Sequence, residues 1–299
     1  MANSTILYAC TPEGLVILTK PGTLPEWLPP RKALAEKAVT SAWAEHGPPI
    51  RVVAVASGGL LVSENGGRTW AEIETPSTVT SLFSFGEPST LIAAMQGGGL
   101  ATSLDSGATW EALPTLPERG NVRSSCVSDS RVYLVLEQAG ETALLAGDPR
   151  TGEWRTVASG EMITAVAFDS TVGDLYAGFA DGVRVSNDAG MSWKTLAGSP
   201  AAGAAITVIP GAMGKHPALV VGKDLGLWSS PDGGTTWQQV ELSERGGVGT
   251  MARDPERRDR LYAATSTGYL FESGNRGQSW ERINPSPLPP ASYLYVLRI

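Results

Sequence analysis

Three short turns of the sequence carry a carboxylate that could take part in catalysis. They are Thr11-Pro12-Glu13, Ala180-Asp181 and Lys223-Asp224. Two carboxylates held about 5–10 Å apart can hydrolyse a glycosidic bond, one as the acid and the other as the base or nucleophile. Glu13 and Asp181 each precede a glycine, so we interpret both as turn residues. Asp224 follows Lys223 and precedes leucine, which makes it the least turn-like of the three acids.

One further charge stands where the strands expected to line the centre of the fold begin. The aligned positions are Thr40, Thr80, Arg123, Thr164 and Gly249. Arg123 is the only charged residue among them. The candidate ligand-binding residues are therefore Arg123, Asp181, Lys223 and Asp224, and we identify no catalytic residue.

The remaining polar residues do not suggest a metal or cofactor site. His46 and His216 flank Gly/Pro turns and have no Cys, His or Asp neighbours at ligand spacing. We therefore predict no metal and no cofactor, and we expect both histidines to be turn residues exposed to water. The run from Arg253 to Arg260 alternates in charge sign, which favours a solvated hairpin tip over an anion site.

The elements that must position these residues are marked by a recurring octet that ends in tryptophan. Its best copies are Ser103–Trp110, Ser186–Trp193 and Ser230–Trp237; Ser63–Trp70 and Ser273–Trp280 carry Asn65 and Asn275 where the others have Asp. Asp or Asn accepts hydrogen bonds from nearby backbone N–H groups, and Gly allows a positive φ. The octet therefore predicts a tight hairpin turn, with the tryptophan ring packed beside it.

The tryptophans give the period of the fold. Trp27, Trp70, Trp110, Trp154, Trp193, Trp237 and Trp280 are separated by 43, 40, 44, 39, 44 and 43 residues. That spacing is typical of a four-stranded propeller blade of about 40–45 residues. Short apolar runs punctuated by Gly, Asp and Pro fill each period. We predict an all-β, seven-bladed β-propeller of four-stranded antiparallel blades. Trp228 lies off this period, and we expect it to be either a core residue or an exposed aromatic for a partner or sugar.

The two ends of the chain predict how the ring closes. The N-terminus begins with a second and a third strand, Ile6–Cys10 and Gly14–Leu18, with no inner strand before them. The C-terminus ends in one extra strand, which supplies the missing inner strand and removes an open edge. We expect one domain over residues 1–299, with blade 1 built from residues 5–36 plus 291–299. Residues 31–43 contain helix formers, but their alignment with other units favours two strands.

The octet resembles the Asp-box, or BNR, repeat of sialidases, sortilin-type receptors, xyloglucanases and photosystem II assembly factors. The resemblance covers nearly the whole chain, although Gly147–Trp154 lacks the Ser and shifts the Asp, and the unit around Trp27 has no box. It implies that the boxes lie between the third and fourth strands, on the face opposite to an active site. A sialidase would also need an arginine triad and a tyrosine nucleophile, and neither is recognisable in this sequence.

Composition excludes several classes of partner. The net charge is −7 with no basic block, which argues against nucleic acid. No stretch approaches the roughly 20 apolar residues of a membrane span, and the start resembles no signal peptide. Cys10 and Cys126 fall in different blades, so we expect two buried free thiols. We expect a cytoplasmic monomer that binds neither nucleic acid nor a membrane.

Two functions remain open. The first is a non-catalytic binding or scaffold propeller, which looks most like the photosystem II assembly factors. The alternative is a glycan-active hydrolase related to sialidases or xyloglucanases that uses acids such as Asp181 and Asp224. In either case we expect the partner, a protein or a carbohydrate, at the central face.

Overall fold

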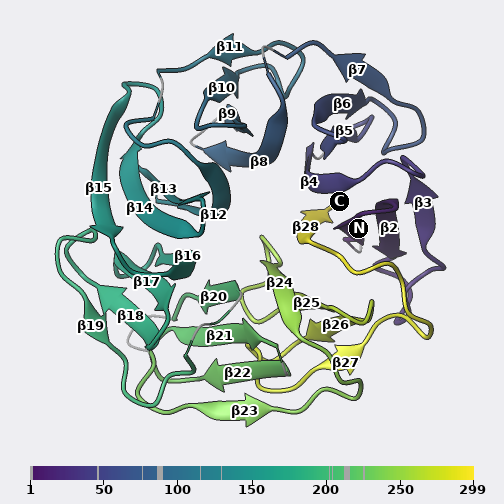
Figure 1. The fold of residues 1–299 in the computed structure, drawn as a ribbon. Helices are drawn as coiled ribbons and strands as arrows, with labels where there is room; N and C mark the ends of the chain where they lie inside the picture. The colour runs from purple at the N-terminus through teal and green to yellow at the C-terminus, as the bar shows by residue number, and fades with distance from the viewer. Residues whose placement is uncertain are drawn as a thin grey trace.

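The residues that the structure describes form seven four-stranded antiparallel sheets around a central opening (Figure 1). This computed structural model describes residues 3–45, 47–75, 77–85, 90–114, 116–128, 130–201, 203, 205–211, 216–224 and 226–299. The predicted all-β, seven-bladed propeller is confirmed. Over these ranges the structure contains no helix, and hence none long and apolar enough to cross a membrane.

Each blade runs from an inner strand at the centre of the ring to an outer strand at the rim. Blade 1 contains, in that order, β28 (Tyr293–Arg298), β1 (Thr5–Thr11), β2 (Gly14–Lys20) and β3 (Arg31–Ala33); blade 2 contains β4 (Val39–Glu45), β5 (Arg51–Ala56), β6 (Gly59–Ser63) and β7 (Ala71–Ile73). Blade 3 contains β8 (Val79–Phe85), β9 (Thr90–Met95), β10 (Leu100–Ser103) and β11 (Glu111–Ala112); blade 4 contains β12 (Asn121–Val127), β13 (Val132–Gln138), β14 (Glu141–Asp148) and β15 (Glu153–Ser159). Blade 5 contains β16 (Ile163–Asp169), β17 (Asp174–Phe179), β18 (Gly182–Ser186) and β19 (Lys194–Thr195). Blade 6 contains β20 (Ala205–Ile209), β21 (Ala218–Lys223), β22 (Gly226–Ser230) and β23 (Gln238–Val240); blade 7 contains β24 (Val248–Arg253), β25 (Leu261–Thr265), β26 (Leu270–Ser273) and β27 (Glu281–Arg282).

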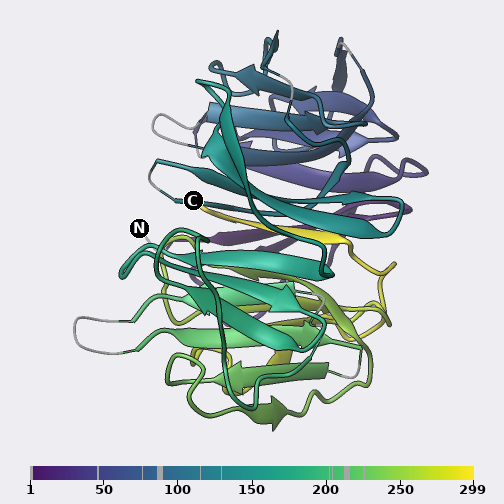
Figure 2. The same ribbon diagram turned by 60° about the vertical axis from the view of Figure 1, so that its left-hand side comes forward.

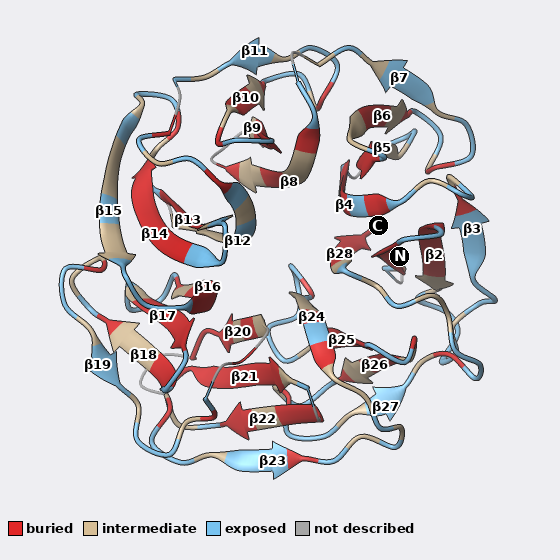
Figure 3. Ribbon diagram, in the orientation of Figure 1, coloured by how far each residue is buried: buried red, intermediate tan, exposed pale blue. Residues whose placement is uncertain are grey.

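The core lies between the blades, and this explains the sequence of the middle strands. In β5, Val52 and Ala54 pack with residues of blade 1, whereas Val53 and Val55 pack with residues of blade 3. Because both faces of the strand are buried, its sequence is a continuous apolar run with no polar alternation. Outer strands such as β11, β19 and β27 are exposed (Figure 3).

The C-terminal strand closes the ring, as predicted. β28 pairs antiparallel with β1, with Tyr295 opposite Tyr8, and the two termini lie side by side (Figure 2). The Ile299 carbonyl accepts from the Ser4 N–H at 2.7 Å. The segment that contains helix formers, residues 31–43, forms β3 and the start of β4, so the strand interpretation is correct.

Each octet pins the hairpin between the third and fourth strands of its blade. In blade 3 the Ser103 hydroxyl donates to Asp105 Oδ1 at 2.8 Å and accepts from the Gly107 N–H at 2.8 Å. Asp105 Oδ1 also accepts from the N–H groups of Ala108 and Thr109, and its Oδ2 accepts from the Thr109 hydroxyl at 2.7 Å. The predicted role of the carboxylate as a backbone acceptor is therefore confirmed.

The octets that contain asparagine reach the same geometry by a different donor. Asn65 Oδ1 and Asn275 Oδ1 accept backbone N–H bonds as Asp105 does. Their Nδ2 groups then donate to the hydroxyls of Thr69 and Ser279. The turn therefore needs one carbonyl-type oxygen and one polar partner for the hydroxyl, and it does not need a charge.

The octet glycine packs closely against the preceding blade. A Cβ added to Gly107, whose φ is +88°, would lie 2.6 Å from Val53 Cγ2 in blade 2, and one added to Gly277 would lie 2.3 Å from Val220 Cγ2 in blade 6. Only glycine fits such a contact at a positive φ. The tryptophan that ends the octet is bonded to the same turn: the indole N–H of Trp110, Trp237 and Trp280 donates to the octet glycine carbonyl.

The two blades that lack an octet use other contacts. In blade 4 the Asp148 carboxylate binds Arg150, whose guanidinium lies 4.8 Å from the Phe85 ring of blade 3. In blade 1 the Trp27 ring packs edge-on against Tyr262 of blade 7, and its N–H donates to Glu272. Cys10 and Cys126 are free thiols; Cys10 is buried, as predicted, and Cys126 is half-buried.

The closure of the ring predicts that the C-terminal strand is essential. Removing residues 291–299 deletes the buried Leu294, Val296 and Leu297 and exposes the edge of β1. Burial of three such side chains contributes roughly 5–8 kcal/mol, which is comparable to the total stability of about 5–15 kcal/mol of a typical domain. We expect the truncated chain to lose most of its cooperative thermal transition in circular dichroism. An unchanged melting temperature would contradict the closure; the exposed-site variant Leu104→Ala serves as a control.

The octet of blade 3 predicts a local dependence on pH. Hydrogen bonds from the Thr109 hydroxyl first, and then from backbone N–H groups, lower the pKa of Asp105 to about 2. An unfolded aspartate titrates at about 3.9. The stabilisation is therefore complete above that pH and is lost as the pH falls through about 2. We expect Asp105→Ala to destabilise the chain by on the order of 1 kcal/mol at pH 7, by analogy with the loss of a cap.

The matched variant for this prediction is Asp105→Asn. It should keep the turn, as Asn65 and Asn275 do in their own octets, and should remove the titration at this site. Thermal unfolding of both chains is measured between pH 7 and pH 2. The difference in melting temperature between wild type and Asp105→Asn should change only below about pH 4. A difference that is constant over the whole range would show that the carboxylate charge plays no part.

Candidate functional site

The central opening holds a cavity of about 730 Å³ whose lining comes from the inner strands of all seven blades. Such a volume falls in the range of sites that bind small molecules or peptide segments. The inner strands begin on the face opposite to the octets, which also carries the second-to-third strand connections, and we refer to the opening of the channel on that face as its mouth. We call this face the channel-mouth face.

Five inner strands carry a β-bulge near their start, after the first residue in four of them and after the second residue in β12. The pairing shifts in register at Val39/Ser41, Val79/Ser81, Val122/Ser124, Ile163/Ala165 and Val248/Thr250. The extra residues are Thr40, Thr80, Arg123, Thr164 and Gly249, the same five positions that mark the strand beginnings in the sequence. A bulge bends the strand and re-aims a side chain. Four of the five line the cavity; Thr164 is buried and donates to the Gly178 carbonyl.

The channel wall differs in polarity from one side to the other. Blades 2, 3 and 4 present hydroxyls, namely Thr40, Ser41, Thr80, Ser81, Ser124 and Ser125. Blades 5 to 7 present mainly small or apolar residues, namely Ala165, Val166, Ala205, Ile206, Gly249, Met251 and Ala252; Thr250, Arg253 and Glu256 are the polar exceptions. The Ser41 and Ser81 hydroxyls are shielded from solvent and have no hydrogen-bond partner among the described residues. The wall is therefore a hydroxyl-rich arc that faces an apolar one.

Arg123 is at the mouth of the channel, as the alignment suggests. Its guanidinium forms an ion pair with Glu137 of the same blade at 2.7 Å, and both side chains are exposed. The pair leaves the arginine solvent-accessible in the cavity lining but partly neutralised.

The other charges of the lining cluster at the octet-face end of the channel. Arg253 donates to the Val208 carbonyl, and desolvation lowers its pKa against the opposing influence of Asp169. Arg298 is buried, binds the Thr5 hydroxyl, and lies 3.8 Å from Glu256. Glu256 is the one carboxylate among the described lining residues. The described part of the lining thus does not contain the pair of acids that glycoside hydrolysis requires.

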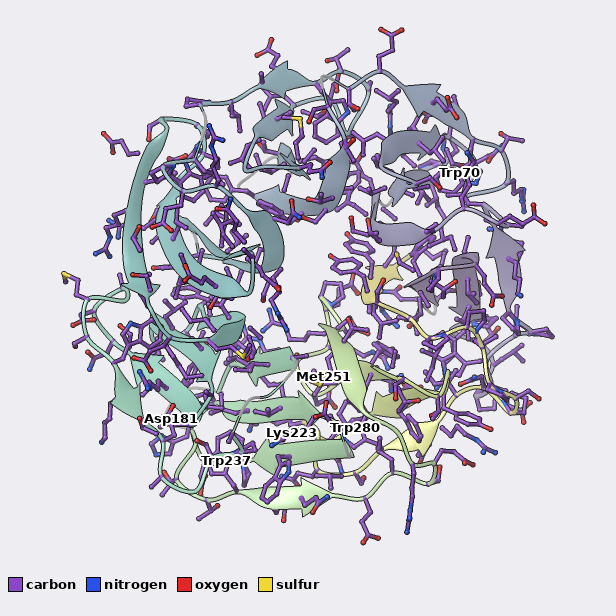
Figure 4. All side chains as sticks on the ribbon, viewed as in Figure 1. Trp70, Asp181, Lys223, Trp237, Met251 and Trp280 are labelled. Atoms are coloured by element: carbon purple, nitrogen blue, oxygen red, sulfur yellow. The ribbon has the colours of Figure 1, made fainter. Side chains whose placement is uncertain are left out.

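Asp181 lies outside the channel (Figure 4). Its carboxylate pairs with Arg184 at 3.1 Å, and the same guanidinium pairs with Glu161 at 2.7 Å. The Arg184 guanidinium also lies 4.1 Å from the centre of the Phe179 ring. Asp181 therefore takes part in a surface ion-pair network at the edge of blade 5.

Lys223 and Asp224 lie on the channel-mouth face of blade 6, between β21 and β22, and do not line the cavity. Lys223 pairs in register with Gly226, so Asp224 is in a tight connection, and its backbone packs closely against Gly247. Within the described ranges neither side chain forms a hydrogen bond or an ion pair. The structure therefore does not bring the four predicted site residues together, and only Arg123 belongs to the cavity.

Several residues of the cavity were not identified from the sequence. The run Arg253–Arg260 is exposed over Pro255–Asp259, but Asp254 is buried and Arg253 and Glu256 line the channel, so the solvated-tip interpretation is only partly correct. Tyr293, Tyr295 and Arg298 of the closing strand also line it. A repeat alignment misses these three because β28 is separated from its blade by most of the chain.

The remaining sequence predictions concern aromatic and metal-binding residues. Trp228 is half-buried and packs with the core between blades 5 and 6. His216 is exposed, as predicted, whereas His46 lies outside the described residues. In the part of the chain that the structure describes, no three His, Cys, Asp or Glu side chains gather closely enough to hold a metal ion.

Comparisons with known proteins show the fold. No protein-family model matches the sequence, and no curated protein matches it significantly. An ancestral GH74 enzyme superimposes with a TM-score of 0.71 at 16% identity, over 93% of this chain but only 44% of that chain. YCF48 from Cyanidioschyzon merolae superimposes with a TM-score of 0.59 at 16% identity, over 84% of this chain and 85% of that chain.

Two complexes are also similar to this chain. A structure of YCF48 bound to D1 peptide gives a TM-score of 0.51 at 15% identity, over 94% of this chain and 78% of that chain. A nidogen/laminin complex contains a chain with a TM-score of 0.56 at 11% identity, over 98% of both chains. At these identities the likenesses establish the propeller fold and leave the function to the site itself.

Proposed function

We propose that this chain is a non-catalytic binding scaffold that receives a segment of a partner protein at the mouth of its central channel. The observation that carries the proposal is the chemistry of the channel wall. It offers hydroxyls and small apolar residues in quantity and, within the described lining, a single carboxylate at the far end. Such a wall can hydrogen-bond and enclose a peptide, but it lacks the acid–base pair of a hydrolase.

The two-sided wall suits an extended peptide. A strand-like segment has polar backbone groups along its edges and side chains that alternate between two faces. The hydroxyls of Ser124 and Ser125, which line the cavity and are only half-buried, supply donors or acceptors for one edge. The apolar arc of blades 5 to 7 accepts small side chains on the other.

The structural neighbours support a protein partner. Propellers of this fold bind a peptide in the YCF48 structure and form a protein complex in the nidogen/laminin structure. We further propose that the octets are Asp-box repeats and that, among the families they suggest, the chain is most like the photosystem II assembly factors. The likeness to YCF48 over most of both chains supports this.

The binding face can be tested by blocking the channel mouth. Thr40→Arg places a long cation at an exposed bulge position that lines the cavity. We expect it to reduce recovery of the partner from the native host at least tenfold, because the side chain fills the mouth. The control, Leu104→Arg, adds the same charge to an exposed residue of an octet on the opposite face. Equal recovery with both variants would contradict the assigned face.

A glycan-active hydrolase is the second candidate, and the GH74 likeness favours it. That superposition has a higher TM-score than those with the YCF48 and nidogen/laminin structures, although this chain spans less than half of the enzyme's length. The acids in question are Asp181 and Asp224 on the channel-mouth face. Asp181 is paired with Arg184 outside the cavity, and Asp224 is exposed to water.

The two candidates are separated by a screen of aryl glycosides. We expect no turnover by the wild-type chain above the rate of the matched variant Asp224→Asn, because no second acid accompanies Asp224. Release of the aryl leaving group is followed by absorbance. Turnover by the wild type that is lost in Asp224→Asn would overturn the binding-scaffold proposal in favour of the enzyme.

A further inference from the structure

A second hollow, of about 510 Å³, lies at the seam between blades 1 and 2 on the octet side of the ring. Its apolar wall comes from both blades and consists of Ile6, Ile17, Leu28, Pro29, Pro49 and Ile50. The octet of blade 2, Ser63–Trp70, contributes Asn65, Gly66 and Arg68 at the rim. The hollow shares no described lining residue with the central channel.

On the blade 1 side, the hollow is bordered by the connection that takes the place of an octet. The connection between β2 and β3 extends toward blade 7, where Lys20 and the Trp27 indole both bind Glu272. Leu28 and Pro29, which follow Trp27 directly, then form the rim of the seam with blade 2. Leu28 is 42% exposed, although its neighbours in the hollow are apolar. Nothing from the described part of this connection fills the space over β1.

A comparison with other blades shows what is missing. Tyr8, Tyr133, Tyr176 and Tyr262 stand on the second strands of blades 1, 4, 5 and 7. An aromatic ring from the following blade covers two of them: Phe168 stacks on Tyr133 at 6.1 Å, and Trp27 packs on Tyr262 at 5.9 Å.

Among the described residues of blade 2, no such ring stacks on Tyr8. Phe168 is the sixth residue of β16, and the sixth residue of β4 in blade 2 is Ala44. The ring that pairs with Tyr8, that of Tyr295 at 6.5 Å, comes from its own blade. Among the described residues, no ring of blade 2 therefore stacks on Tyr8; Trp70, which holds the place in blade 2 that Trp27 holds in blade 1, packs instead against the core of this seam.

The polar groups of the hollow favour an acid. The Tyr8 hydroxyl is buried and has no hydrogen-bond partner among the described residues, and the side chain is only 1% exposed. Burial raises the pKa of Tyr8, so the phenol is neutral and can donate. Arg31 and Arg68 line the hollow, no described lining residue is acidic, and neither arginine has an ion pair within the described ranges. The neighbouring Glu64 is paired with Arg51.

We infer that this hollow binds a small aromatic carboxylate that carries a polar ring substituent. The ring occupies the position over Tyr8 that Phe168 and Trp27 occupy over Tyr133 and Tyr262. The carboxylate lies at the exposed rim, where Arg68 is free to pair with it. The ring substituent reaches the buried Tyr8 hydroxyl and satisfies it. This inference does not depend on the function proposed for the central channel.

The probe for this site is 4-hydroxyphenylacetate, with phenylacetate and the cation tyramine as matched analogues. Binding to the full chain is measured by saturation-transfer NMR and by calorimetric titration. We expect the two acids to bind and tyramine not to bind. Arg68→Gln should weaken both acids about tenfold, the typical effect of losing one charge-assisted hydrogen bond.

The variant Tyr8→Phe tests the buried hydroxyl. It should weaken 4-hydroxyphenylacetate about tenfold and leave phenylacetate unchanged, with a melting temperature equal to or above that of wild type. The control is Tyr262→Phe, which removes an equivalent buried hydroxyl away from the hollow and should change neither affinity. Absence of binding by both acids, binding of tyramine as tightly as the acids, or equal effects of the two tyrosine variants would each overturn the inference.

Discussion

The packing of each sheet between two neighbours is the interaction on which the rest of the structure depends. A single blade exposes two apolar faces, as the burial of alternate β5 residues against blades 1 and 3 demonstrates, so no blade is stable without both neighbours. A ring meets this condition only if it has no end. The pairing of β28 with β1 is therefore the contact that turns seven marginal units into one cooperative core.

The octets solve a local problem within that ring. A hairpin at the rim must be compact enough to approach the preceding blade, and Gly107 and Gly277 do so at distances that a Cβ would prohibit. The Ser and Asp side chains satisfy the backbone groups that such a tight turn leaves unpaired. Blades 1 and 4 replace this device with Trp27 and Arg150, which contact blades 7 and 3. In blade 1 the connection that contains Trp27 extends toward blade 7, and the hollow lies over Tyr8 beside this connection.

The fold was predictable from the sequence because the tryptophan period reports a property that every blade repeats. The site was predictable only where a repeat alignment applies. Arg123 was identified because its position aligns with Thr40 and Thr80 at the bulge. Arg253, Glu256 and Arg298 were not, because the end of β24 and the closing strand meet only after the ring closes. Asp181 and Asp224 lie on the same face as the channel mouth. A repeat pattern in the sequence, however, does not indicate how far a residue lies from the channel axis.

The position of the bulges links the architecture to the proposed function. An inner strand can widen the channel mouth only where its pairing is interrupted, and five inner strands are interrupted at the same step. The residues that follow the bulge are serines in blades 2, 3 and 4 and alanine or threonine in blades 5 and 7. The blades therefore have nearly the same backbone conformation, but the side chains with which they line the channel differ in polarity. Glycoside hydrolysis needs two acids at a fixed spacing, and the described lining contains one carboxylate. A wall of hydroxyls opposite small apolar residues offers an extended chain both hydrogen bonds and apolar contact, which supports the proposed binding scaffold.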